Sequence, residues 1–357
     1  CKHVQTTTIT PDSDRYNLFD YSYTSSNSSA SRSHWDKFAE EVAKFTHCLK
    51  GRVCEIGSND GYLLKQFLKK DCDVLGVDAS ESMTKLSNLN KIKTINLIFD
   101  YNSSALIQKE HGEFDVVIAN NVFNHSNDPV SFAKGANRIL KSNGFYIFEV
   151  PYWKCSVEST KIDQIYHEHV SYFTGRSVKE IMELAGFQIN RIEIVDYHGG
   201  SLRVYAEKTT KDEINHCDDL SKMISSEVDL FSITIYENLK KTLIKRKIDF
   251  KHRLLSIKKS GGSIIAIGAA AKGNTLLNFL NLDSSLIDWV TDTSKFKCGK
   301  TTPLSNIEIC NDNVISTYEK VYALILCWNL SDAIKTKLRK LNPQIEFINF
   351  YGNNYEE

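Results

Sequence analysis

The sequence predicts an α/β protein with two domains. Its 357 residues are about the length of two domains of ordinary size. Short apolar runs alternate with helical patterns in two separate parts of the chain, and a long, charged helical stretch divides them. Apolar residues make up 41% of the chain and charged residues 25%, which is an ordinary globular composition and excludes a disordered or fibrous protein.

The N-terminal part is expected to begin irregularly and then to form a helix. Residues 1–31 are rich in Ser, Thr, Asn and Tyr. Trp35, Phe38 and Val42 recur at helical spacing, which predicts a helix over 32–49.

Five apolar runs then predict the strands of a parallel sheet. Pro129 suits the first turn of a helix, and Pro151 ends the last run. Strands that are apolar throughout and separated by helices are typical of a parallel sheet covered on both faces. The predicted strands are 52–57, 73–78, 94–99, 114–119 and 145–150, and the predicted helices are 62–69, one from about 81, and 129–141.

A polar, aromatic connection is predicted over 153–174, and loops of this length are usually functional or mobile. A helix over 177–185 follows it. The extended runs 188–196 and 201–207 are joined through His198-Gly199-Gly200, which predicts an antiparallel pair.

Residues 212–259 show a long, charged helical pattern that ends at Gly261-Gly262. A second α/β pattern follows, with strands at 263–268, 286–291, 321–327 and 346–348 and helices at 272–280 and 333–341. The predicted organisation is an N-terminal segment over 1–50, a first α/β domain over 51–210, and a helical linker with a second α/β domain over 211–357.

Charge, hydropathy and cysteine pattern narrow the class of protein. The formal net charge is zero, which disfavours a dedicated nucleic-acid binder. The longest apolar stretches, 264–271 and 321–328, are much shorter than the roughly 20 residues of a membrane helix. Nine cysteines without a C-x-x-C pair, and no visible signal peptide, predict a reducing, cytoplasmic location. The sequence carries no signal for an oligomeric state.

The loop after the first predicted strand is typical of a cofactor site. Its glycines allow a sharp turn and a close approach of a ligand to the backbone, and the following helix offers free N–H groups. Asp78, at the end of the second strand, can accept both hydroxyl hydrogens of a ribose. The loop residues are Glu55, Gly57, Ser58, Asn59, Asp60 and Gly61.

The spacing is E-x-G-x-x-x-G, without the third glycine of a dinucleotide loop. A cofactor with a ribose and a carboxylate but no phosphate fits this spacing, and S-adenosylmethionine (SAM) is such a molecule. A structural strand-to-helix turn is the alternative. Asp100 follows the third strand, near the expected adenine, and Asn120 and Asn121 follow the fourth, at the edge where ligands bind such sheets.

Titratable groups follow the fourth and fifth strands. His125 comes after the fourth, and the run Tyr166, His167, Glu168 and His169 lies in the loop after the fifth. Together they supply a general base, an orienting acceptor and a donor for an oxyanion, the set needed to remove a proton next to a carbonyl. An ordinary hydrogen-bonded loop histidine is the alternative for His125.

A metal site at this run is the other interpretation, because His167 and His169 flank Glu168. The i, i+2 spacing places the two histidines on opposite sides of an extended segment. No cysteine pair is nearby to complete a tetrahedral site. We therefore expect no metal here.

The chain resembles the SAM-dependent sugar C-methyltransferases that act on nucleotide-linked 4-keto deoxysugars. The resemblance covers nearly the whole chain. It is carried by the stretches 21–26 (YSYTSS), 55–62, 166–173 (YHEHVSYF), 198–203 (HGGSLR) and 268–277 (GAAAKGNTLL). It implies a Rossmann-like SAM-binding domain, a C-terminal domain that helps to hold the nucleotide-sugar, and a role in deoxysugar biosynthesis with methylation expected at C-3.

The resemblance also implies roles for individual residues. His169 would be the base, Tyr166 and His125 would bind the keto group or the enolate, and Glu168 would orient the base or hold a sugar hydroxyl. Tyr21 or Tyr23 would close over the active site, and His167 would contact the substrate.

Lys272 opens a predicted helix among small residues and is expected to bind a phosphate of the substrate. Close helix packing is the alternative. The family usually begins with a zinc-binding domain of four cysteines, of which Cys1 alone could remain. We therefore expect either a truncated chain or a member that lacks this domain, and no structural zinc.

Three rival functions remain at this point. The first is an NAD-dependent nucleotide-sugar oxidoreductase or epimerase, since both halves are α/β. The second is a non-catalytic protein that only binds a nucleotide-sugar. The third is RNA binding through the basic stretch 240–259, which the acids around 212–229 offset.

Overall fold

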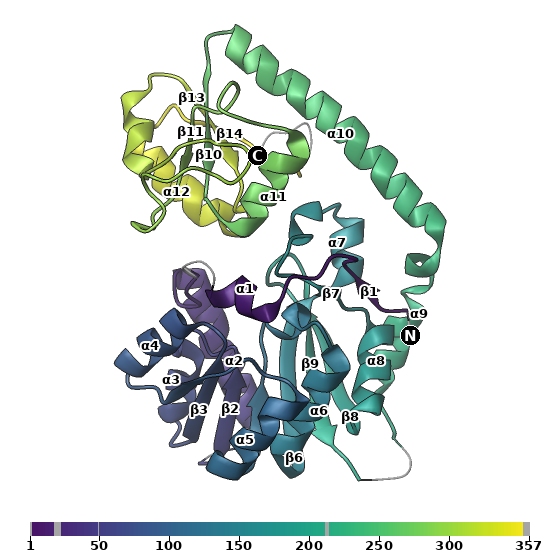
Figure 1. Ribbon diagram of the computed structural model, residues 1–357. Coiled ribbons are helices and arrows are strands. Elements are labelled where there is room, and N and C mark those ends of the chain that lie inside the picture. Colours follow the sequence, from purple (N-terminus) through teal and green to yellow (C-terminus); the bar gives the residue numbers. More distant parts are fainter. Residues whose placement is uncertain (1, 18–22, 49, 211–213, 353–357) are drawn as a thin grey trace. The chain divides into compact units, whose positions relative to one another are not determined.

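The computed structural model describes residues 2–17, 23–48, 50–210 and 214–352. The chain divides into two compact units. The first unit comprises residues 1–155 and 167–231, and the second comprises residues 156–166 and 232–357. The boundaries predicted from sequence differ from these units in three places: residues 1–50 belong with the first unit, residues 156–166 with the second, and residues 211–231 with the first. Each unit is a sheet covered by helices (Figure 1).

The first unit is built on a seven-stranded sheet in the order β4-β3-β2-β5-β6-β9-β8. The pairs from β4 to β6 are parallel, and β6–β9 and β8–β9 are antiparallel. The antiparallel pair predicted from the glycine turn is thus confirmed. The strands are β2 (Arg52–Ile56), β3 (Asp73–Asp78), β4 (Thr94–Asn96), β5 (Phe114–Ile118), β6 (Leu140–Pro151), β8 (Phe187–Val195) and β9 (Ser201–Lys208).

Helices cover both faces of this sheet because successive strand residues point to opposite sides. Val53 and Val116 pack in one buried cluster with Phe38 of α2 and Phe67 of α3. The neighbouring strand residues pack in a second cluster on the other face, with α6 and α8. The helices are α2 (Ser29–Phe45), α3 (Tyr62–Leu68), α4 (Glu81–Leu89), α5 (Tyr101–His111), α6 (Pro129–Ile139), α8 (Gly175–Leu184) and α9 (Asp218–Ser225).

Short elements surround the carboxyl edge of this sheet. The strand β1 (Val4–Gln5) pairs antiparallel with β7 (Ser171–Tyr172), so the N-terminal segment lies beside the loop after β6. The connection predicted over 153–174 contains this strand, a short helix and a 3-10 turn. The remaining elements of the first unit are α1 (Asp12–Asn17), η1 (Phe123–His125) and η3 (Val228–Phe231). The helix α7 (Trp153–Glu158) runs from the first unit into residues 156–166, and η2 (Ile162–Gln164) belongs to the second unit.

The second unit has a five-stranded parallel sheet in the order β12-β11-β10-β13-β14. Residues of β10 alternate between two buried clusters, one on each face. The long helix α10 buries Leu243, Phe250, Leu254 and Ile257, and these form its apolar face. The elements are α10 (Ile233–Lys259), β10 (Ser263–Ile267), α11 (Ala271–Leu280), β11 (Trp289–Thr291), β12 (Ile309–Cys310), η4 (Asp312–Thr317), β13 (Val321–Ile325), η5 (Trp328–Leu330), α12 (Ser331–Leu341) and β14 (Glu346–Ile348).

None of the helices among the described residues combines the length and the apolar character that crossing a membrane requires.

A buried ionic network ties β6 to β9 and to α2. The Glu149 side chain is fully buried, and its two oxygens pair with Arg203 Nε at 2.6 Å and with His34 Nε2 at 2.8 Å. Arg203 also donates to Glu41. A buried carboxylate that loses its partner keeps the full cost of its desolvation. The fold of the first unit therefore depends on this pairing.

We predict that Arg203→Met destabilises the first unit by about 3–5 kcal/mol, because Glu149 then lacks its guanidinium. Arg191→Met is the matched control. Arg191 pairs with Glu193 along one strand at the surface, so this change should cost less than about 1 kcal/mol. Native-state hydrogen exchange of β6 and β9 amides measures both. Equal protection in the two variants would contradict the prediction.

Candidate active site

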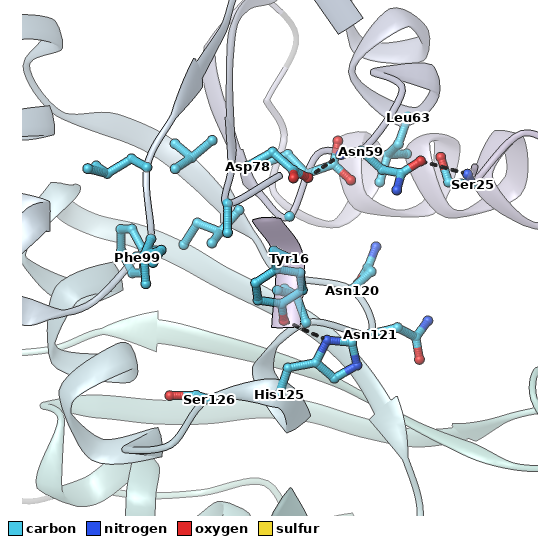
Figure 2. Close-up of a pocket in the computed structure, with 18 of the residues that line it drawn as sticks. Tyr16, Ser25, Asn59, Leu63, Asp78, Phe99, Asn120, Asn121, His125 and Ser126 are labelled. Carbon is cyan, nitrogen blue, oxygen red and sulfur yellow. Dashed lines mark hydrogen bonds between the residues drawn. The ribbon is translucent and has the colours of Figure 1, made fainter. Parts of the chain in front are cut away.

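A cavity opens in the first unit at the carboxyl ends of β2, β3 and β5 (Figure 2). This is the edge at which parallel α/β sheets bind ligands. Its wall mixes carboxylates, amides and apolar side chains. It is lined by Tyr16, Tyr23, Ser25, Trp35, Glu55, Ile56, Gly57, Asn59, Leu63, Val77, Asp78, Ala79, Leu97, Ile98, Phe99, Asn120, Asn121, Val122, His125, Ser126 and Phe132.

The loop between β2 and α3 needs glycine at position 57. Gly57 has φ +73°, and a Cβ there would lie 2.8 Å from Val122 Cβ. A side chain would therefore strain the backbone and collide with the loop after β5. A hydrogen bond holds the Asn59 side chain of this loop: the backbone N–H of Ser25 donates to Asn59 Oδ1 over 2.9 Å (Figure 2).

Glu55 is a buried acid whose Oε2 has no hydrogen-bond partner among the described residues. Burial raises the pKa of its carboxyl well above the usual range, and Asp60 and Asp78 raise it further. An unpaired acceptor of this kind, inside a cavity wall, fits a ligand that brings a positively charged donor.

Asp78 lies at the end of β3, as the sequence predicts, and lines the cavity. Its Oδ2 accepts from the backbone N–H of Asn59 and its Oδ1 from that of Ser80, each over 2.8 Å. Burial raises its pKa, and these two hydrogen bonds oppose the rise. The carboxylate is thus fixed at the cavity wall.

Other residues predicted for the cofactor lie behind the wall. The Asp60 carboxylate accepts from Ser25 Oγ over 2.6 Å and so anchors the segment that precedes α2. Ser58 is buried and Gly61 is the N-cap residue before α3, and neither lines the cavity.

Asp100 differs from its prediction. Its Oδ1 accepts from the backbone N–H of Ser103 over 2.6 Å, so it caps α5. It does not line the cavity. The preceding residues Leu97, Ile98 and Phe99 do, and they offer an apolar wall beside β4.

The two asparagines after β5 both reach the cavity. Asn120 Oδ1 accepts from the backbone N–H of Glu149 over 2.9 Å. Its Nδ2 is buried and has no hydrogen-bond partner among the described residues. The backbone N–H of Asn121 donates to the Glu149 carbonyl over 2.7 Å. The backbone of β6 therefore fixes Asn120 with its amide donor unpaired.

His125 is buried at the end of η1, and its ring faces the cavity (Figure 2). Its Nδ1 lies 3.0 Å from the Tyr16 hydroxyl, and its Nε2 has no hydrogen-bond partner among the described residues. Burial, helped by Arg15, lowers the pKa of this imidazole to about 3. The His169 ring, also buried, lies 5.2 Å from the His125 ring, between centroids.

The run that contains His169 is divided. Tyr166 belongs to the second unit, whereas His167, Glu168 and His169 belong to the first. The His167 ring is exposed, with Nε2 3.8 Å from Glu168 Oε1. Burial raises the pKa of Glu168 to about 7, and Arg15 opposes the rise. No cluster of three or more His, Cys, Asp or Glu that could hold a metal occurs in the described part of the chain.

Three predicted substrate residues remain. Tyr23 lines the cavity, and Tyr21 lies outside the described residues. Lys272 lies in the first turn of α11 in the second unit, with its Nζ 5.5 Å from the centroid of the Trp328 ring, and Lys161 Nζ lies 3.9 Å from the same centroid. Burial lowers the pKa of Lys272 to about 8 although Asp163 opposes this effect.

Sequence reasoning missed the residues that support this site from the N-terminal segment. Arg15 and Tyr16 both contact His125. The chain has 16 tyrosines, and nothing in the sequence distinguishes Tyr16 from the others. Ser25 was within a quoted motif, but its bonds to Asn59 and Asp60 depend on the folded chain.

Two protein families match this chain. Residues 32–192 match the methyltransferase domain family, and residues 196–349 match the C-methyltransferase C-terminal domain family. The matched ranges cover most of the second unit and all of the cavity lining except Tyr16, Tyr23 and Ser25. The protein is a SAM-dependent methyltransferase. Its similarities support a C-methyltransferase family, and the alternative of an NAD-dependent oxidoreductase is not retained.

Individual proteins resemble this chain over different lengths and at different levels of identity. The chain is 27% identical over 285 residues to C-methyltransferase NovU from Streptomyces niveus, covering 79% of this chain and 67% of NovU. It is 32% identical over 110 residues to a ubiquinone biosynthesis O-methyltransferase from Rhodopseudomonas palustris, covering 30% of this chain and 43% of that protein. Magnesium protoporphyrin IX methyltransferase from Synechocystis PCC 6803, solved with bound SAH, has a TM-score of 0.41 at 14% identity, covering 50% of this chain and 83% of that one.

The cavity of this methyltransferase fits SAM. Glu55 would hold the ammonium group of the cofactor with its unpaired buried oxygen, and Asp78 would hold the ribose hydroxyls with its carboxylate. The apolar wall formed by Leu97, Ile98 and Phe99 suits the adenine ring. Asn120 has a spare buried donor for the carboxylate end.

We predict that SAM affinity rises with pH, with the rise lying above the range in which an ordinary glutamate titrates, and that Glu55→Gln removes this dependence. Burial raises the pKa of the Glu55 carboxyl and so favours its protonated form in the free protein. An ammonium group beside it favours the ionised form, so binding releases a proton and strengthens as protons become scarcer. Isothermal titration calorimetry in buffers of different ionisation enthalpy measures the released proton.

The control for this titration is Glu81→Gln, which removes the same charge from the exposed end of α4. Glu55→Gln should also weaken SAM binding by roughly 10-fold or more, because a hydrogen bond between charged groups is lost. A Glu55→Gln protein that retains the pH slope of the parent would show that another group titrates.

Proposed function

We propose that this methyltransferase acts on carbon: it removes a proton next to the ketone of a nucleotide-linked 4-keto deoxysugar and methylates the resulting enolate, with C-3 as the expected position. The observation that carries the proposal is the contact between two buried histidine rings at the cofactor cavity. His125 lines the cavity, and the centroid of the His169 ring lies 5.2 Å from that of the His125 ring. The similarity to a C-methyltransferase supports the same reaction class.

The two histidines divide the chemistry. His169 takes the proton from the carbon next to the ketone. His125, neutral because of its low pKa, donates a hydrogen bond to the oxygen that becomes negative in the enolate. A donor in a dry site typically contributes about 3–4 kcal/mol to such an oxyanion. Bound SAM supplies the electrophilic methyl group. The chain aligns the carbon with that methyl group and excludes water.

Glu168 is proposed to orient His169 or to hold a sugar hydroxyl. It is largely buried, and burial raises its pKa to about 7, so its carboxyl titrates near neutral pH. A carboxylate in this range can hold an imidazole in one orientation and stabilise the charge that the base acquires.

The second unit is proposed to bind the phosphates of the nucleotide. Lys272 and Lys161 both flank Trp328, and the helix α11 begins beside them without a side-chain cap. Asp163 interacts electrostatically with Lys272 and is fully buried, and its oxygens accept from Trp328 Nε1 at 2.6 Å and from the Tyr351 hydroxyl at 2.9 Å. Two ammonium groups and free backbone N–H groups suit a phosphate.

We predict that His169→Asn stops the exchange of the substrate's α-hydrogen with D₂O and lowers methylation by about 10²–10⁴-fold, as expected when a general base is lost. SAM binding should stay unchanged. Mass spectrometry of nucleotide-linked 4-ketosugars incubated with and without SAM measures both reactions. His111→Asn, at the end of α5, is the control. Exchange at the parent rate in His169→Asn would place the base elsewhere.

We further predict an acid limb in kcat/KM with an apparent pKa near 7, the value to which burial raises Glu168. Activity should fall as the pH drops through this value because Glu168 becomes protonated. Glu168→Gln should be slow at every pH and should lack this limb. An unchanged limb in Glu168→Gln would assign the titration to another group.

A further inference from the structure

The N-terminal helix α1 places a hydroxyl on one nitrogen of His125. Tyr16 OH lies 3.0 Å from His125 Nδ1 (Figure 2). The two rings are stacked, with centroids 6.4 Å apart and planes 28° apart. The other nitrogen, Nε2, is buried and has no hydrogen-bond partner among the described residues. One nitrogen is therefore occupied by the protein, and the other remains for a ligand.

Tyr16 is held in place by its neighbours. The buried guanidinium of Arg15, the residue before it, donates to the carbonyl oxygen of His125, to Asn127 Oδ1 and to the carbonyl oxygen of Thr10. The α1 helix thus contacts His125 at two points, one on the backbone and one on the ring.

The segment before α1 is attached to the loop that carries His169. Val4 and Gln5 pair with Tyr172 and Ser171. The backbone N–H of Thr6 donates to the Val170 carbonyl over 2.9 Å. One continuous N-terminal segment therefore contacts the loops of both histidines.

A neutral imidazole carries one proton, on Nδ1 or on Nε2, and its hydrogen-bond partner decides which. Burial and the charge of Arg15 lower the pKa of His125, so the ring is neutral at physiological pH. A phenol O–H is a good donor, and a bare imidazole nitrogen is a good acceptor. With Tyr16 donating to Nδ1, the proton of the ring sits on Nε2.

We propose that Tyr16 is a positioning residue that holds His125 in the Nε2–H tautomer, so that the ring presents a donor to the cavity. The inference rests on the proposed function, in which an enolate oxygen forms at this place. The opposite tautomer would turn a lone pair toward that oxygen and repel it. A fixed tautomer therefore keeps His125 as the donor and leaves proton removal to His169.

The first test reads the tautomer directly and needs no substrate. Nitrogen-15 NMR of histidine-labelled protein is recorded for the parent and for Tyr16→Phe, and the His125 signals are assigned by their loss in His125→Gln. The parent should show a protonated Nε2 and an acceptor Nδ1. Tyr16→Phe should show a mixture of tautomers or a protonated Nδ1. A parent protein with a protonated Nδ1 would overturn the proposal whatever the substrate is.

The second test is a double-mutant cycle on methylation. Tyr16→Phe should lower kcat by roughly 10–100-fold, part of the loss seen when an oxyanion donor is removed, and leave KM for SAM within about 2-fold. In the His125→Gln background the same change should lower kcat by less than about 2-fold, because a glutamine amide has no tautomer to fix. An equal loss in both backgrounds would show that Tyr16 only supports the fold.

Tyr101→Phe is the matched control, because Tyr101 is exposed at the start of α5 and lies outside the cavity wall. The two tests also separate this proposal from the proposed function. If no ketosugar is methylated but NMR shows the expected tautomer and its loss in Tyr16→Phe, the proposed substrate is wrong and the role of Tyr16 in setting the tautomer stands.

Discussion

The site depends on polar atoms that the fold buries without giving them a partner among the described residues. Glu55 Oε2, Asn120 Nδ2 and His125 Nε2 are three such atoms on residues that line one cavity. Each unsatisfied group costs about 1–3 kcal/mol in the free protein. Together they present one acceptor, one donor and one tautomer-dependent group. Burial of these atoms, more than the loop sequence itself, makes the cavity ready for a ligand with complementary charge.

The cost of this arrangement is met by strong interactions directly behind the wall. The strand β6 connects the cavity wall to these interactions. At Glu149, the backbone N–H and C=O hold Asn120 and Asn121, and the side chain is locked between Arg203 and His34. The motif that begins at His198 and ends at Arg203 therefore acts on the site through β6. Its glycines shape the turn, and a Cβ at Gly200 would lie 2.7 Å from Cys155 Sγ.

Much of the first sheet could be predicted because its strands are apolar throughout, and strand ends then place Asp78, Asn120 and Asn121 at one edge. The helix α5 escaped prediction because its polar sequence carries little amphipathic signal; it begins with a capping box between Asp100 and Ser103 instead. Asp100 was predicted to contact the cofactor because it follows a strand. An acid in that place can equally be the N-cap of the next helix, which is what Asp100 is.

The N-terminal contribution could not be predicted, since a hydrogen bond between residues 16 and 125 leaves no periodic pattern in a single sequence. The same holds for the pairing of β1 with β7. Both contacts join segments that are more than 100 residues apart. Motif reasoning finds residues that carry chemistry, but it finds the residues that orient them only when they are close in sequence.

One physical cause gives the catalytic groups their protonation states. Burial lowers the pKa of His125 to about 3 and raises that of Glu168 to about 7, so both are pushed toward their neutral forms. A neutral His125 avoids the large cost of holding an unpaired charge in a dry interior. In the proposed reaction the enolate adds a negative charge at this place, near the sulfonium of SAM and the imidazolium that forms at His169. Donors that are already oriented stabilise this charge without reorganising. The guanidinium of Arg15, bonded to the carbonyl of His125, adds a fixed positive charge behind the ring, where it opposes protonation of the imidazole and favours the enolate.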